Sequence, residues 1–146
     1  MKNAAKLTFI GFLAGFILLF SSCIEEEPVI VPDVYVSFSI NLDLPDYNAL
    51  NSVNNSVKVL NEGYAKSGVI IYRYSLDEFY AFDATCPQHI SVVTSVNLDD
   101  SGAAGSATCP HCNTIYYFPS LGYPSSGYPL KRYRATLSGR ILTVTN

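Results

Sequence analysis

The stretch GVIIYRYSLDEFYAFDATCPQH, residues 68 to 89, decides the fold of this 146-residue chain. Residues 68–74 and 78–84 are rich in β-branched and aromatic side chains, and they flank the short polar tripeptide SLD. Two such runs around a short turn predict a β-hairpin. The second run leads directly into Cys86 and His89, so the hairpin ends at a pair of candidate metal ligands.

The chain on either side of this hairpin, from residue 34 onward, also has an almost wholly β pattern. Residues 34–42, VYVSFSINL, alternate between apolar and polar side chains, which is the period of a half-buried strand. No window of twelve residues has a convincing helical period. We therefore predict an all-β domain with further strands at 56–60, 113–118, 128–137 and 140–146, the last two joined by a turn at Ser138 and Gly139.

The N-terminus reads as an export signal. Lys2 and Lys6 precede an apolar run at 7–20 that ends in the tetrapeptide FSSC. A helix needs roughly 20 apolar residues to span a bilayer, so this run is short for a permanent membrane anchor. FSSC is similar to the lipobox of bacterial lipoproteins, which predicts a signal peptide at 1–22 and a lipidated Cys23 that attaches the chain to a membrane.

The next segment, IEEEPVIVPD at 24–33, is acidic and contains two prolines. This composition resists packing into a core, so we predict a tether over 23–33 and a single domain over 34–146. The acidic run Glu25 to Glu27 resembles the export signal of some Bacteroidota surface lipoproteins, and it fits a solvated spacer equally well. The expected location is the cell envelope, on the periplasmic side or at the cell surface of the outer membrane.

The charge of the chain argues against nucleic acid as a partner. Two of its nine basic residues, Lys2 and Lys6, lie in the signal, which leaves seven against twelve acidic residues, a net charge of −5. The largest basic cluster is Lys131, Arg132 and Arg134, which we attribute to a protected edge or exposed strand.

Three cysteines remain after Cys23, and three cannot all pair within one chain. The tetrapeptide CPHC at 109–112 occurs in oxidising dithiol proteins, in which a helix that begins at the motif lowers the pKa of a thiol. Residues 113–124 here are β-branched and aromatic and are broken by prolines and a glycine. Thiol–disulfide exchange is therefore the least favoured of three hypotheses.

A zinc site is the second hypothesis. Cys86 and His89 form C-x2-H, nineteen residues follow, and Cys109 and Cys112 form C-x2-C. This spacing suits tetrahedral zinc, and Asn113 after the second pair tolerates the left-handed conformation that such turns need. In this case the chain is a structural or interaction lipoprotein without redox activity. An empty site with a disulfide between Cys109 and Cys112 belongs to the same class.

The third hypothesis comes from a resemblance to the Rieske iron–sulfur domain, and in particular to small Rieske-like lipoproteins of Bacteroidota. FYAFDATCP at 79–87 resembles the entry to the first cluster-binding loop. ATCPHCNTIYYFPSLG at 107–122 resembles the second loop, with Tyr116 as its aromatic residue and Gly122 as its glycine, and 128–144 resembles the closing hairpin. The resemblance implies an antiparallel barrel or sandwich with a two-loop metal-binding subdomain over roughly 84–125. Residues 123–129, YPSSGYP, fall at the proline-rich loop that shields the cluster.

The Rieske ligand pattern is C-x-H in the first loop and C-x-x-H in the second. Cys86 and Cys109 fall on its cysteine positions, whereas Gln88 and Cys112 fall on its histidine positions. His89 is displaced by one residue. The resemblance implies a [2Fe-2S] cluster held by an altered set, Cys86, His89, Cys109 and Cys112, with a reduction potential below that of a standard Rieske centre.

His111 is also displaced by one residue, and its role stays open. The cluster would pass single electrons to a membrane or periplasmic redox protein. The signal lacks a twin arginine, which favours zinc acquired after export over a cluster built in the cytoplasm. No general base or nucleophile stands out, so we expect an electron-transfer or binding module rather than an enzyme with its own substrate site.

Overall fold

The computed structural model describes residues 30–146. The predicted signal peptide, the lipid site at Cys23 and the tether as far as residue 29 lie outside this part of the chain. Within the described residues, no helix has both the length and the apolar character that crossing a membrane requires.

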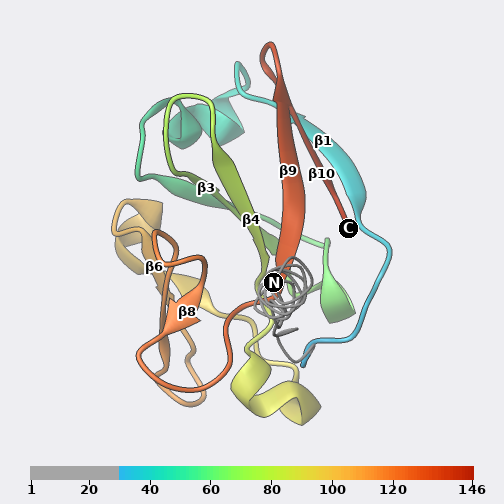
Figure 1. Ribbon diagram of the computed structural model, residues 1–146, viewed down its shortest axis with the longest axis vertical. Helices are drawn as coiled ribbons and strands as arrows, with labels where there is room; N and C mark the ends of the chain where they lie inside the picture. Colours follow the sequence, from blue (N-terminus) through green and yellow to red (C-terminus); the bar gives the residue numbers. More distant parts are fainter. Residues whose placement is uncertain (1–29) are drawn as a thin grey trace, which may run out of the picture.

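A six-stranded antiparallel sheet forms the larger part of the molecule (Figure 1). Strand β9 joins its two halves, because it pairs with β10 from Arg134 to Ser138 and with β4 through Arg132 and Tyr133. The strands, in spatial order, are β1 (Ser37–Asn41), β10 (Ile141–Thr145), β9 (Arg132–Ser138), β4 (Phe79–Asp83), β3 (Val69–Arg73) and β2 (Ser56–Val59).

A smaller four-stranded antiparallel sheet carries the second cysteine loop, at the lower left of Figure 1. Its strands are only two or three residues long. They are, in spatial order, β5 (Asn97–Leu98), β6 (Ser106–Thr108), β7 (Ile115–Tyr117) and β8 (Tyr123–Pro124).

The prediction of an all-β fold is confirmed. The hairpin at 68–84 forms as β3 and β4, with Val69 opposite Asp83 and Arg73 opposite Phe79. The turn between β9 and β10 also forms, and Gly139 adopts φ +61° there. The helices of residues 30–146 are short 3-10 helices: η2 (Pro45–Asn51), η3 (Tyr64–Lys66), η4 (Pro87–Val92) and η5 (Asp99–Gly102). A large antiparallel sheet with a small two-loop subdomain is the arrangement that the Rieske resemblance implied.

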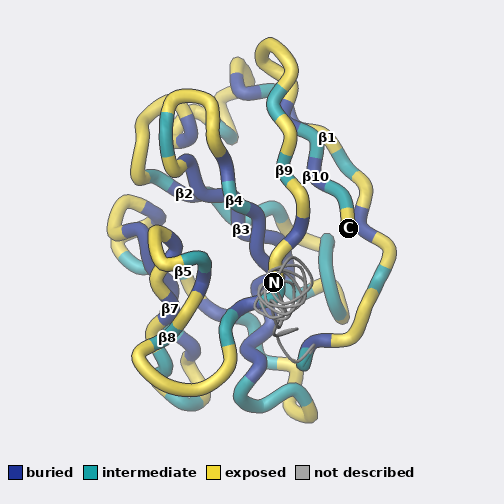
Figure 2. Tube along the Cα trace, in the orientation of Figure 1, coloured by how far each residue is buried: buried dark blue, intermediate teal, exposed yellow. Residues whose placement is uncertain are grey.

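Two hydrophobic cores lie on opposite faces of β3 and β4, where Figure 2 shows a mostly buried trace. On β3, Val69 and Ile71 join the first core, whereas Ile70 and Tyr72 join the second. This alternation follows from the two-residue period of a strand. The first core fills the large sheet, and the second joins it to the small sheet and contains Cys86 and Cys109.

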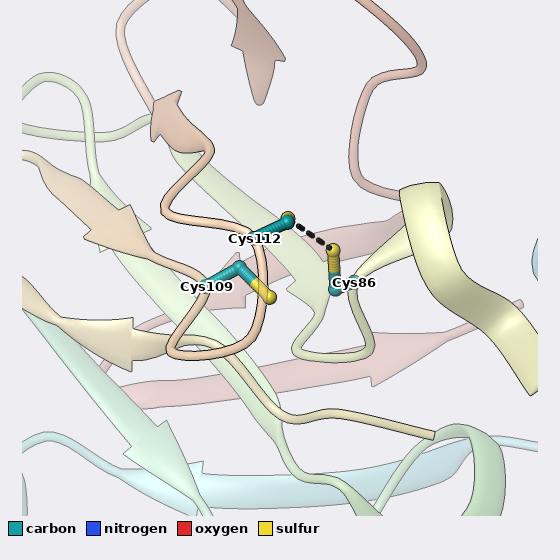
Figure 3. Close-up of side chains that lie close together, drawn as sticks. All are labelled: Cys86, Cys109 and Cys112. Carbon is teal, nitrogen blue, oxygen red and sulfur yellow. Dashed lines mark hydrogen bonds between the residues drawn. The ribbon is translucent and has the colours of Figure 1, made fainter. Parts of the chain in front are cut away.

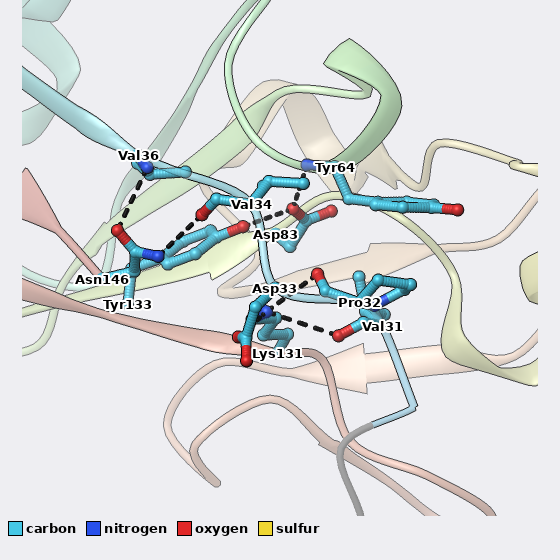
Figure 4. A network of polar contacts seen from close by, with 10 residues as sticks. All are labelled: Val31, Pro32, Asp33, Val34, Val36, Tyr64, Asp83, Lys131, Tyr133 and Asn146. Carbon is cyan, nitrogen blue, oxygen red and sulfur yellow. Dashed lines mark hydrogen bonds and ion pairs between the residues drawn. The ribbon is translucent and has the colours of Figure 1, made fainter.

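Among the described residues, packing into the domain extends at least to Val31, three residues before the domain start indicated by the sequence. Val31 is 1% exposed. The Lys131 ammonium donates hydrogen bonds to the carbonyl oxygens of Val31 and Pro32 and pairs with the Asp33 carboxylate at 2.5 Å (Figure 4). The last residues of the predicted tether are therefore fixed to the start of β9.

A buried carboxylate anchors the start of the first cysteine loop. Asp83 has no exposed surface, and its two oxygens accept hydrogen bonds from the backbone N–H of Tyr64, the backbone N–H of Thr85 and the hydroxyl of Tyr133, at 2.6, 2.8 and 2.7 Å. Figure 4 shows the contacts of Asp83 with Tyr64 and Tyr133. Burial and the Asp83 carboxylate raise the pKa of Tyr133. The network ties β4, β9 and η3 together three residues before Cys86.

Candidate metal centre

The first loop places Cys86 immediately after β4. The Cys86 N–H donates to the Thr94 carbonyl at 2.8 Å, and the Val96 N–H donates to the Ala84 carbonyl at 2.8 Å. These two bonds close the loop at its base. The helix η4 lies within it and begins at Pro87, which suits the first position of a helix because proline has no N–H to satisfy.

The second loop is a tight turn between β6 and β7. The Cys109 N–H donates to the Thr114 carbonyl at 2.9 Å, and the Asn113 N–H donates to the Cys109 carbonyl at 2.8 Å. Asn113 adopts φ +58°, a left-handed conformation that asparagine tolerates. The turn carries Cys109 and Cys112 on one short, hydrogen-bonded segment.

The two loops bring three sulfur atoms together (Figure 3). The Sγ atoms of Cys86, Cys109 and Cys112 all lie within 4.8 Å of one another, and those of Cys86 and Cys112 are 3.8 Å apart. All three are free thiols; Cys86 and Cys109 are buried and Cys112 is partly buried. Convergent thiols in an apolar core are the donor set of a soft metal ion.

Two hydroxyl groups contact these sulfurs. The Tyr116 hydroxyl lies 3.1 Å from Cys86 Sγ, and the Thr114 Oγ1 lies 3.1 Å from Cys112 Sγ. Burial raises the pKa of the Cys86 thiol to about 12, although the Tyr116 hydrogen bond acts in the opposite direction. Burial also acts to raise the pKa of the Cys112 thiol, but hydrogen bonds with Thr114, Cys109 and Cys86 together outweigh it, and the net direction is downward.

His89 lies beside His111 rather than among the three sulfurs. The two imidazole rings meet edge to face with their centroids 4.8 Å apart. The backbone of His89, at φ −139° and ψ 55°, interrupts η4. The structure therefore brings together three of the four predicted ligands and pairs the fourth with the histidine whose role the sequence left open.

Gln88 stands at one of the two positions where the Rieske pattern has a histidine. Its side-chain amide donates to the Tyr128 carbonyl at 3.0 Å, which ties residues 123–129, hereafter the proline loop, to the first cysteine loop. Cys112 occupies the other histidine position. The donor set of a standard Rieske cluster, two cysteines and two histidines at those positions, does not fit this chain.

The proline loop approaches Gln88 where the loop has no side chain. Gly127 adopts φ +96°, and a Cβ at this position would overlap the side-chain amide of Gln88. Gly139 has a comparable φ of +61° but nothing within 4 Å of its Cβ position. Replacement of either glycine by alanine strains the backbone, but only the change at 127 also displaces Gln88.

We expect Gly127→Ala to lower the free energy of unfolding by about 1 kcal/mol more than Gly139→Ala, because its methyl group overlaps the end of the Gln88 side chain, which must move and lose its hydrogen bond to Tyr128. Urea denaturation of both variants measures the difference. In a Gln88→Ala background the excess should become smaller, since the overlap is then removed and only the difference in backbone strain remains. An excess that is undiminished without Gln88 would contradict this explanation.

Comparison with known proteins returned no matching family model and no matching curated protein. Among solved structures, the ferredoxin of carbazole 1,9a-dioxygenase from Nocardioides aromaticivorans is 18% identical, with 76% of this chain and 94% of that chain covered and a TM-score of 0.45. A chain of the complex of reduced oxygenase and oxidized ferredoxin in carbazole 1,9a-dioxygenase is 18% identical, with 75% and 93% covered and a TM-score of 0.49.

The Escherichia coli protein NirD is 16% identical, with 75% of this chain and 98% of that chain covered and a TM-score of 0.42. These identities lie below 25% and the TM-scores below 0.5. Likenesses at this level do not assign a function to this chain.

Proposed function

We propose that this chain is an electron-transfer module of the cell envelope, in which Cys86, Cys109 and Cys112 hold an iron centre that carries single electrons. The observation that carries the proposal is the convergence of three free thiols, from two loops, in an apolar core. Thiolates favour iron–sulfur centres, zinc and Cu(I) over hard metal ions. Iron supplies one-electron chemistry by cycling between its ferrous and ferric states, whereas zinc has no redox chemistry.

The surrounding residues support such a centre in three ways. The second core shields Cys86 and Cys109 from water, which lowers the local dielectric constant. The hydroxyl groups of Tyr116 and Thr114 are placed to donate to the sulfurs once these are thiolates. The hydrogen bonds that close both loops hold the thiols in place without the metal, which limits reorganisation on electron transfer.

His89 remains our proposed fourth ligand. It lies on the same loop as Cys86, three residues further along. We further propose that Cys23 is lipidated and that the partner is a membrane-bound or periplasmic redox protein; both proposals rest on the export signal and the lipobox-like FSSC.

A second candidate function is a structural or interaction lipoprotein whose thiols hold zinc. The loss of both Rieske histidine positions, to Gln88 and Cys112, favours it. Thiol–disulfide exchange has less support, because the element that follows the CPHC turn in the described structure is strand β7 rather than a helix.

The test is the metal content of full-length protein purified without oxygen from its native envelope. Metal and acid-labile sulfide are counted per chain, and the visible spectrum is recorded through a reductive titration. Iron with a spectrum that changes reversibly on one-electron reduction supports electron transfer. Zinc, or a metal-free protein, refutes it.

Removal of the Tyr116 hydroxyl is expected to lower the midpoint potential of the bound iron by on the order of 50 mV, because a hydrogen bond to sulfur stabilises the more electron-rich, reduced state. Potentiometric titration of Tyr116→Phe measures the shift. The matched control is Tyr117→Phe on the same strand, since Tyr117 is exposed and should leave the potential unchanged. Equal potentials in both variants would exclude a role for the Tyr116 hydrogen bond.

A further inference from the structure

We infer that the site binds one metal ion in a tetrahedral, thiolate-rich environment, rather than a cluster of two irons. The inference rests on the proposed metal-binding function and specifies its inorganic chemistry. It departs from the Rieske resemblance, in which two cysteines bind one iron and two histidines bind the other. The spacing of the sulfurs, the geometry of the second loop and the contacts of Gln88 carry it.

The spacing of the sulfur atoms matches ligands of a single ion. A tetrahedral ion with metal–sulfur bonds of about 2.3 Å holds any two of its sulfur ligands about 3.8 Å apart. The Sγ atoms of Cys86 and Cys112 are 3.8 Å apart, and all three sulfurs lie within 4.8 Å of one another. Ligands on different irons of a two-iron cluster are separated further, because the iron–iron vector lies between them. Any three-cysteine set on such a cluster includes at least one pair of this kind.

The second loop explains why Cys109 and Cys112 share an ion. The bonds between Cys109 and Thr114 and between Asn113 and Cys109 close a turn around two ligands that are three residues apart. In the Rieske pattern the corresponding residues bind different irons, the cysteine one and the histidine the other. Here the second residue of the pair, Cys112, is a thiol directed toward Cys86 (Figure 3). Cys109 and Cys112 would therefore bind the same ion.

In the first loop, the residue at the position of the Rieske histidine is not available to bind a second iron. Gln88, at the expected histidine position, donates its amide to Tyr128 and lies against Gly127. The nitrogen donors that remain nearby are His89 and His111, which contact each other edge to face. A single tetrahedral ion needs only one ligand besides the three thiolates, and we assign that place to His89, which follows Cys86 on the same loop.

The experiment is X-ray absorption spectroscopy of the metal in full-length protein purified without oxygen, together with the ratios of metal and acid-labile sulfide to protein. We expect one metal ion per chain, no sulfide, a sulfur shell near about 2.3 Å and no metal–metal scattering path. Two irons with two sulfides and an iron–iron path would overturn the single-ion inference and leave electron transfer standing. One zinc would support the inference and refute electron transfer. A chain without metal would overturn both.

Cobalt(II) added to the metal-free full-length chain provides an independent count. A 1:1 titration end point with a sulfur-to-cobalt charge-transfer band is the expected result. His111→Ala should keep the end point and the band, whereas His89→Ala should weaken binding at least about 10-fold. A 2:1 end point in the wild type that falls to 1:1 in His111→Ala would overturn the inference, because it would place a second ion on the histidine pair.

Discussion

Replacement of Cys112 by serine is expected to lower the affinity of the chain for a thiophilic metal by more than about 100-fold, because it removes one of three converging thiolates. A serine hydroxyl is a poor ligand near neutral pH, since it stays protonated. Cys112 is the sulfur nearest to solvent, so the substitution leaves the core around Cys86 and Cys109 intact. Competition between the protein and a chromophoric chelator for zinc or cobalt measures the affinity.

The matched control for this variant is His111→Ala, which also alters the second loop but removes no thiol. Its affinity should equal that of the wild type, and the circular dichroism spectra of both metal-free variants should match the wild type. If Cys112→Ser binds metal as tightly as the wild-type chain, Cys112 is not a ligand. Both the proposed iron centre and the zinc alternative would then lose one of the ligands that they share.

Replacement of Asp83 by alanine is expected to lower the free energy of unfolding by about 3–5 kcal/mol. Asp83 is fully buried and accepts hydrogen bonds from Tyr64, Thr85 and Tyr133. Alanine would leave three donors without their partner, two of them buried and one partly buried, and each unsatisfied buried donor costs free energy. Urea denaturation, extrapolated linearly to water, measures the loss.

Tyr133→Phe is the comparison variant for Asp83→Ala. It removes one donor from the carboxylate and leaves the two backbone N–H bonds in place, so the expected loss is only about 1–2 kcal/mol. Equal losses in the two variants, or a loss below about 1 kcal/mol for Asp83→Ala, would show that the network does not anchor the first cysteine loop.

The strands of the large sheet could be predicted because their sequences carry their own pattern. Residues 69–73 and 79–83 pair in the predicted hairpin, since each run is long enough to show its β character and the turn between them is short. Three strands of the small sheet, β5, β6 and β8, could not be predicted. Each has only two or three residues, too few for a two-residue period to be recognised, and their pairing depends on residues brought together by the fold.

The candidate site was partly predictable, because the spacing of its cysteines is a local pattern in the sequence. The spacing of Cys86, Cys109 and Cys112 predicted that they meet, and their sulfurs do. The direction of His89 depends on the irregular backbone of η4, which the sequence does not specify. The contact between Gln88 and Tyr128 joins residues 40 positions apart and leaves no local signal.

The role of Tyr116 was predictable only in part. The resemblance identified it only as the aromatic residue of the second loop. Its contact with Cys86 follows from the register of β7, in which Tyr116 points inward while Ile115 and Tyr117 point to solvent. A shift of one residue in that strand would exchange the inner and outer side chains.

Strands β3 and β4 separate two cores, and from this arrangement we expect an order in which the molecule opens locally. The small sheet should open and expose the second core while the first core keeps the large sheet intact. Backbone amides of β5 to β8 should therefore exchange with deuterium before those of β3, β4 and β9. A bound metal would join the loop at Cys86 to the turn at Cys109 and Cys112, so it would slow exchange in the small sheet more than in the large one. Hydrogen exchange thus reports occupancy of the site from the backbone alone, whichever metal is present.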